Sequence, residues 1–114
     1  LVVIRHSPYG SSLAKASIDV ALAAAAFEQP VDLLFLGDGV LQLHPDQNSR
    51  ILGVKNIGRQ LATLPLYDIN CVFADASAIA RYRLDIARAP VKTCVINALE
   101  IRELMLKYDH LLGF

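Results

Sequence analysis

The 114-residue chain lacks tryptophan, has one methionine and two cysteines, and shows no excess of either charge. Its eleven basic and eleven acidic side chains cancel, so no global field favours a nucleic acid or an anionic membrane. Basic residues clustered between positions 50 and 92 are interpreted as a solvated face, with contact to RNA or an acidic protein as the alternative. No apolar run reaches the roughly 18–20 residues of a membrane-spanning helix, and no signal-peptide pattern is present. We therefore expect a cytoplasmic protein without a membrane partner.

Cofactor and metal motifs are also missing. Residues 10–17 lack the second glycine beside the lysine of a phosphate loop, and no GxGxxG occurs. Arg5-His6-Ser7 stands where a phospho-acceptor receiver domain needs acidic residues. The three histidines match no zinc spacing and no Ser/His/Asp arrangement. We expect no cofactor and no metal, and a serine-containing flavin loop at residues 7–12 is the alternative.

The chain is 54% hydrophobic and 19% charged, whereas ordinary domains have about 45–50% and 25%. This surplus suggests a surface that another protein covers. Apolar strand-like runs alternate with helix-like segments, which predicts one α/β domain over residues 1–114. The expected architecture is flavodoxin-like or Rossmann-like, with three layers: a parallel sheet of about five strands and helices on both faces. Strands are expected over residues 1–5, 31–36, 69–74, 91–96 and 110–114. Helices are expected over about 11–28, 50–64, 77–83 and 97–108. The expected N-caps are Ser11 or Ser12, Asn48 or Ser49, and Asn97.

The segment after the second strand offers one carboxylate, Asp38, followed by apolar residues. A single carboxylate suits a turn or a helix cap better than acid–base chemistry. Val40, Leu41 and Leu43 are better suited to touching another protein than to binding a polar ligand. We therefore predict that these three residues form a subunit interface.

Both cysteines, Cys71 and Cys94, lie inside apolar, β-branched runs, and there is no CxxC. This context predicts two buried thiols in a reducing compartment rather than a disulfide. A reactive thiolate needs partial exposure and a positive environment, which is expected at the strand–helix junction three residues beyond Cys71. The alternative interpretation is a sulfur carrier that uses Cys71.

Three segments together are similar to the DsrE/DsrF-like sulfur-relay family. They are Asp38-Gly-Val-Leu-Gln-Leu43, Leu66-Tyr-Asp-Ile-Asn-Cys71 and the ending Tyr108-Asp-His-Leu-Leu-Gly-Phe114. Pro8 and Gly10 also fall where the DsrF-type (TusC) subunit carries a Pro-x-Gly. The chain most resembles that subunit, and the resemblance spans its whole length.

The resemblance implies a parallel α/β fold and a cytoplasmic TusBCD-type heterohexamer, a dimer of trimers with TusB-like and TusD-like partners. Such a complex passes persulfide sulfur to a TusE-like acceptor for 2-thiolation of the tRNA wobble uridine, so tRNA would be met only indirectly. In sulfur oxidisers, the corresponding DsrEFH complex serves dissimilatory sulfur metabolism. The family's nucleophilic cysteine follows the third strand, where this chain has Ala74. The resemblance therefore implies a non-catalytic structural subunit.

Overall fold

The computed structural model describes residues 1–5, 13–27, 29–43 and 57–114, and for residues 13–15 and 57–59 it describes the backbone alone. The expected caps at residues 11–12 and 48–49, and the first part of the helix expected from residue 50, lie outside the described residues. So do His6 and Ser7.

Strands and helices alternate along the described chain. The strands are β1 (Val2–Ile4), β2 (Leu33–Phe35), β3 (Val72–Asp75), β4 (Cys94–Ile96) and β5 (Leu112–Gly113). The α-helices are α1 (Leu13–Ala26), α2 (Ile57–Ala62), α3 (Ala76–Tyr82) and α4 (Ala98–Leu106), and the 3₁₀ helices are η1 (Gly37–Leu43), η2 (Leu64–Tyr67) and η3 (Ile86–Arg88). Most elements are shorter than the sequence predicts, because hydrophobic runs continue beyond the hydrogen-bonded pairs.

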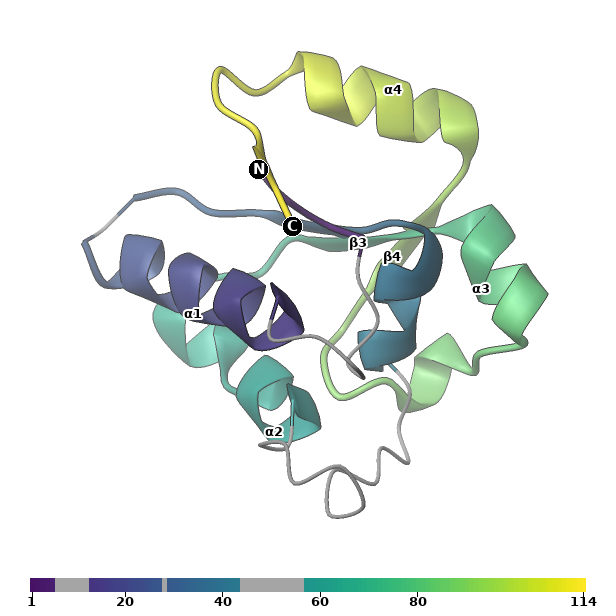
Figure 1. Ribbon diagram of the computed structural model, residues 1–114, viewed down its shortest axis with the longest axis horizontal. Helices are drawn as coiled ribbons and strands as arrows, with labels where there is room; N and C mark the ends of the chain where they lie inside the picture. Colours follow the sequence, from purple (N-terminus) through teal and green to yellow (C-terminus); the bar gives the residue numbers. More distant parts are fainter. Residues whose placement is uncertain (6–12, 28, 44–56) are drawn as a thin grey trace.

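The five strands form one parallel sheet in the order β4-β3-β2-β1-β5. From β1 to β4 the chain moves in one direction across the sheet, and it then returns to place β5 beside β1. Right-handed crossovers put the connections of the two directions on opposite faces. Figure 1 shows this arrangement: α1 and α2 lie on one side of the sheet, and α4 lies alone on the other. The predicted three-layer α/β fold is confirmed.

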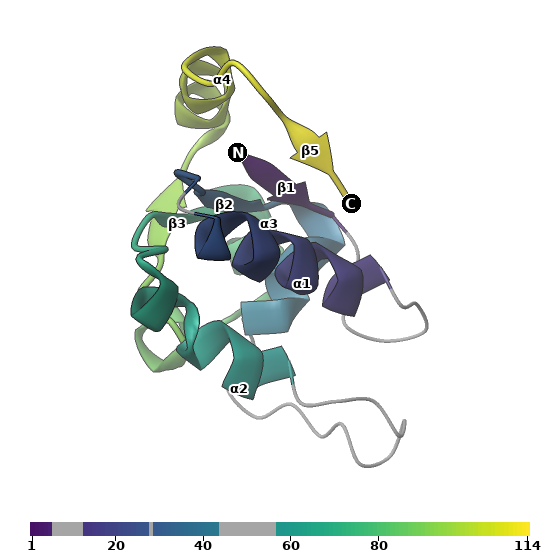
Figure 2. The same ribbon diagram turned by 90° about the vertical axis from the view of Figure 1, so that its left-hand side faces the viewer.

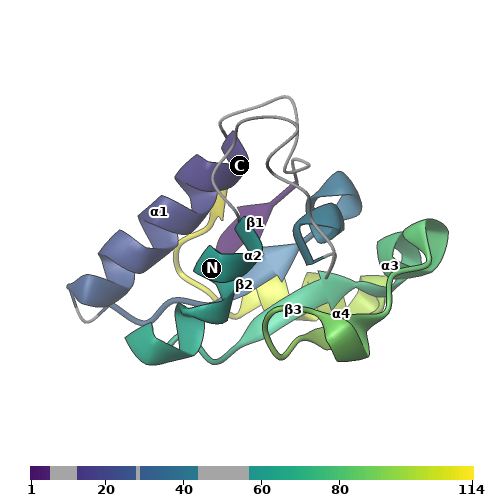
Figure 3. The ribbon, with the colours of Figure 1, turned by 90° about the horizontal axis from the view of Figure 1, so that it is seen from below.

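The alternation of side chains along each strand divides the core between the two faces of the sheet. On the face of α1, the first cluster contains Val2, Ile4, Leu33 and Phe35, together with buried residues of α1, α3 and η1. On the opposite face, a smaller cluster of Val3, Leu34, Ile96 and Leu104 packs under α4. Figure 2 shows α4 and α1 on opposite sides of the sheet, and Figure 3 shows from below the side on which α1 and α2 lie. One helix thus covers a sheet face that is as wide as the face shared by the other helices.

Helix α4 begins at the predicted cap. The side chain of Asn97 accepts a hydrogen bond from the backbone N–H of Glu100 at 2.9 Å, and the Glu100 carboxylate accepts one from the Asn97 N–H at 3.0 Å. This reciprocal pair is a capping box, which satisfies two N–H groups at the start of the helix. It fixes the direction in which the chain leaves β4.

Candidate functional site

In a parallel α/β sheet, ligands usually bind beyond the carboxyl ends of the strands. The polar residues that the sequence brings to this edge are Asp38 after β2, Asp75 at the end of β3 and Asn97 after β4. In the structure each of these side chains accepts a hydrogen bond, either from the backbone at the start of a helix or from a side chain of a neighbouring helix. Asn97 caps α4, as described above.

Asp75 is the N-cap of α3. Its Oδ1 accepts hydrogen bonds from the backbone N–H of Ser77 at 3.1 Å and from the Ser77 hydroxyl at 2.9 Å. The preceding residue, Ala74, is fully buried in the cluster on the α1 face. The side chain at position 74 thus points into the protein, and the exposed polar groups at the end of β3 serve helix capping.

Asp38 joins η1 to α3, because its carboxylate accepts a hydrogen bond from the Tyr82 hydroxyl. This hydrogen bond is the main reason why the pKa of Tyr82 lies above its ordinary value. The guanidinium carbon of Arg81 lies 5.5 Å from the centre of the Tyr82 ring, within the range of a cation–π contact. Asp38 therefore has a structural role in which it ties two neighbouring segments together.

The segment around η1 is built into the core more deeply than the sequence predicts. Val40 is fully buried and Leu43 is 1% exposed, so neither side chain is available to a partner. The prediction of an interface at Val40 and Leu43 is corrected, because the 3₁₀ helix turns both side chains toward the sheet. Leu41 is only partly buried and stays a predicted contact residue. Gly39 packs directly on the carbonyl of Ile4, so this helix lies against the end of β1.

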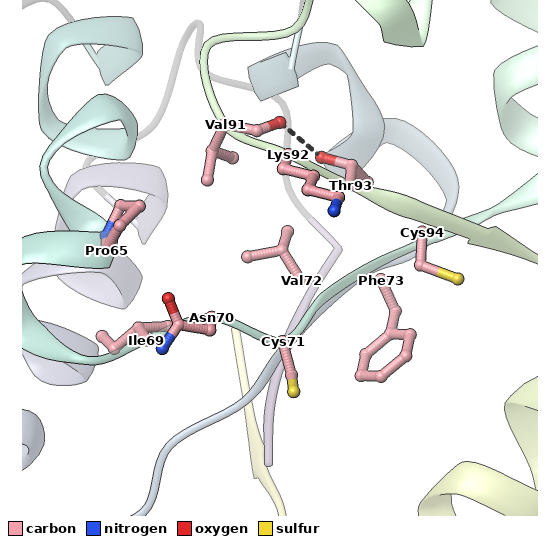
Figure 4. Close-up of a pocket in the computed structure, with 10 residues that line it drawn as sticks. All are labelled: Pro65, Ile69, Asn70, Cys71, Val72, Phe73, Val91, Lys92, Thr93 and Cys94. Atoms are coloured by element: carbon pink, nitrogen blue, oxygen red, sulfur yellow. Dashed lines mark hydrogen bonds between the residues drawn. The ribbon is translucent and has the colours of Figure 1, made fainter.

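The prediction of buried thiols is wrong, because Cys71 and Cys94 are both exposed free cysteines. Cys71 precedes β3, and Cys94 lies on β4, which is an edge strand. The sequence could not show this, since an apolar run does not distinguish an edge strand from a central one. Both residues line a groove of about 650 Å³ between the amino-terminal parts of β3 and β4, which we call the β3–β4 groove. Figure 4 shows both sulfur atoms on the side of the strands to which the Phe73 ring points.

Cys71 belongs to a small polar cluster that sequence reasoning missed. The Asp32 carboxylate accepts a hydrogen bond from the Tyr108 hydroxyl, which links the start of β2 to the chain after α4. The negative charge of Asp32, with burial and a hydrogen bond to the same carboxylate, raises the pKa of the Cys71 thiol. Burial and Asp32 also raise the pKa of Tyr108. These residues are far apart in the sequence, and no local pattern joins them.

Replacing Asp32 with asparagine is therefore expected to make Cys71 more reactive. Removing the negative charge lowers the thiol pKa, so more thiolate is present at pH 8 and the reaction with a disulfide reagent is faster. The rate should be measured by the absorbance of the released thiol of the reagent, on a Cys94→Ser background in which Cys71 is the one remaining cysteine. Asp85→Asn is the matched control, since Asp85 caps η3 and asparagine can cap it equally well. A rate that Asp32→Asn leaves unchanged, or lowers, would contradict the role of this carboxylate.

Two further observations concern the described residues alone. Within them, no three His, Cys, Asp or Glu side chains gather in a way that could hold a metal ion. The helices in the same part of the chain are all too short or too polar to cross a membrane. What the structure does place at the carboxyl edge of the sheet are the capped starts of α3 and α4 and the buried Ala74.

Fold and site together define a small α/β domain with an all-parallel sheet, capped helix starts at the carboxyl edge and an edge strand with an exposed thiol. The chain belongs to the DsrE/DsrF-like family, whose model matches residues 1–114. This confirms the family resemblance.

Among curated relatives, the chain is 31% identical over 112 residues to a "Protein TusC homolog" of Pseudomonas aeruginosa, covering 98% of this chain and 94% of that protein. It is 37% identical over 75 residues to the "Intracellular sulfur oxidation protein DsrF" of Allochromatium vinosum, covering 66% and 55%. Among solved structures, the ychN protein of E. coli superposes with a TM-score of 0.80 at 20% identity, covering 99% of this chain and 97% of that one. The last likeness supports the fold alone.

Proposed function

We propose that this chain is a non-catalytic structural subunit of a cytoplasmic sulfur-relay complex of the TusBCD type. Its partners are TusB-like and TusD-like subunits in a heterohexamer, a dimer of trimers. The assembled complex passes persulfide sulfur to a TusE-like acceptor for 2-thiolation of the tRNA wobble uridine, and this chain meets tRNA only through the complex. The observation that carries the proposal is the similarity to a TusC homolog over nearly the whole chain.

Two features of the site support a structural role. The place that we assign to the family's nucleophile is Ala74, whose methyl group can carry no sulfur and is buried in the core. The neighbouring polar residue, Asp75, is occupied in capping α3. Large apolar side chains are instead exposed over several elements, as is common for subunits that bury surface on assembly: Phe27, Leu66, Leu99, Leu106, Leu111 and Leu112.

Two alternatives have an observation in their favour. The DsrF relative favours a subunit of a dissimilatory sulfur-oxidation complex, in which the fold and the partner surfaces would serve another pathway. Exposure of Cys71 favours an independent sulfur carrier. The raised pKa of the Cys71 thiol argues against the carrier, because a persulfide forms by attack of the thiolate.

Co-expression with TusB-like and TusD-like partners from the same genome is expected to give one stable complex on gel filtration. In that complex, the double variant Cys71→Ser/Cys94→Ser should transfer persulfide sulfur to the TusE-like acceptor as fast as the unchanged chain, because neither thiol is on the route of the sulfur. Transfer is followed by mass spectrometry of the acceptor, which gains one sulfur atom.

Two results would argue against the proposal. A monomer that binds neither partner would remove the structural role. Loss of transfer by the cysteine-free variant in an intact complex would show that the chain carries sulfur itself. Thiolated tRNA as the final product would separate the TusBCD-type pathway from sulfur oxidation.

A further inference from the structure

We propose that the free edge of β4 is a docking edge for an extended segment of a partner subunit. That segment pairs with β4 as a sixth strand, places an apolar side chain in the β3–β4 groove and brings a carboxylate to Lys92. The inference rests on the proposed function, because it requires a partner.

The first observation is the bare edge of the sheet. Among the residues that the structure describes, β4 is the outermost strand and pairs with β3 alone, so its other side presents backbone N–H and C=O groups. Edge strands that avoid pairing with other chains are very short, carry charged residues or prolines, or are covered by another segment. β4 is short, with the three residues Cys94, Val95 and Ile96, but these include no charge and no proline. The opposite edge is less suited to pairing, since β5 has two residues and one is Gly113.

The second observation distinguishes a strand from a helix as the partner. Successive side chains of a strand point to opposite faces of the sheet. Cys94 and Val95 are neighbours in β4, and both are exposed, Val95 to 41%. A helix packed on one face would cover one of them. An added strand lies beside both, because its own side chains alternate between the two faces.

The third observation is the groove beside this edge. Its walls are mainly apolar, with Pro65, Ile69, Val72, Phe73 and Val91 contributing. Lys92, which is exposed, is the one charged residue among the described residues that line it. Peptides that add to a sheet edge gain affinity from main-chain hydrogen bonds and specificity from pockets for alternate side chains. An apolar residue for the groove and an acidic residue for Lys92 are the complementary features.

The docking edge also accounts for the two exposed thiols. A cysteine behaves as a small apolar side chain and is usually buried. Cys71 and Cys94 both line the β3–β4 groove, so a segment that fills the groove removes both from water. The apolar context of the two cysteines then reflects burial in the complex rather than in the isolated chain.

The test uses the complex with TusB-like and TusD-like partners. The backbone amides of β4 that point away from β3 are expected to exchange with deuterium at least about tenfold more slowly in the complex than in the free chain, because hydrogen bonds to the added strand protect them. Cys94→Lys and Val95→Lys, which place a charge on opposite faces of the edge, should each weaken assembly by at least about tenfold. Ala23→Lys on α1 is the matched control, at an exposed side chain outside the set of exposed large apolar residues, and should change assembly by less than about twofold.

Each of the following four results would overturn the inference. An effect of one lysine variant without the other indicates a helix on one face. A complex that tolerates both, with unchanged amide exchange in β4, places the interface elsewhere and leaves the proposed function standing. A homodimer of the free chain that either lysine variant converts to a monomer identifies a second copy as the occupant. Absence of any complex with the unchanged chain removes the proposed function and the docking edge together. Thermal unfolding of each variant excludes misfolding, and the exchange measurement needs no variant.

Discussion

Replacing Gly39 with alanine is expected to destabilise the folded chain by about 3 kcal/mol or more. A Cβ atom at this position would lie 2.1 Å from the Ile4 carbonyl oxygen and 2.8 Å from its carbonyl carbon. Both atoms belong to the backbone of β1, which is held between β2 and β5, so neither can move aside without breaking sheet hydrogen bonds. The free energy of unfolding should be measured by urea titration with far-ultraviolet circular dichroism, since the chain has no tryptophan to report by fluorescence.

Gly37→Ala is the matched control, two residues earlier in the same 3₁₀ helix. Gly37 has a φ of +50° and no atom within 4 Å of an added Cβ. Its replacement therefore costs the backbone preference alone, about 1–2 kcal/mol. If Gly39→Ala were no more destabilising than Gly37→Ala, the close approach of η1 to β1 would be contradicted.

This contrast gives a physical meaning to the sequence Asp38-Gly-Val-Leu-Gln-Leu43. Gly39 allows close approach to β1, Val40 and Leu43 fill the core, and Asp38 accepts a hydrogen bond from Tyr82 of α3. This sequence, which is part of the resemblance to the family, therefore specifies how η1 packs on the sheet. Leu41 is the residue of the predicted interface that remains accessible in part.

A cysteine introduced at position 74 is expected to be almost unreactive in the folded chain. Ala74 has no exposed surface and packs in the cluster on the α1 face, so a thiol there is shielded from reagent and its thiolate is disfavoured by burial. On a Cys71→Ser/Cys94→Ser background, Ala74→Cys should react with a disulfide reagent at least about a hundredfold more slowly than in urea, since reaction requires local opening.

Ala80→Cys on the same background is the control. Ala80 is exposed on α3, so a thiol there should react in the folded chain at nearly the rate seen in urea. Fast reaction of Ala74→Cys without urea would mean that position 74 faces an accessible crevice. In that case one substitution could restore a nucleophile, and the structural role would be weakened.

The fold could be predicted from the sequence because its signals are local. Continuous apolar runs over residues 33–36 and 71–74 indicate strands buried on both faces, and Leu33, Leu34 and Phe35 are indeed fully buried. Alternation with helix-like segments then indicates a parallel sheet. Asn97 followed by Glu100 is a capping pattern that can be recognised without coordinates, and the structure forms the complete capping box.

The errors have one cause, which is that exposure is set by the packing of segments that are distant in the chain. Cys94 stands in an apolar, β-branched run, but β4 lies at the edge of the sheet, so this thiol is exposed. Val40 and Leu43 follow a glycine-containing turn that is typical of a surface loop, but a 3₁₀ helix directs them inward. Exposure depends on neighbours that are distant in the chain.

The sequence by itself determined the α/β class, the family and the alanine at the end of the third strand, because each depends on residue types at fixed spacing. The tertiary structure alone decided which strand is left at the edge, that both thiols line one groove, and that Asp32 lies beside Cys71 and Tyr108. The physical reason is that burial and pKa are set by contacts between segments, and the return of the chain from β4 to β5 is what leaves β4 at the edge of the sheet.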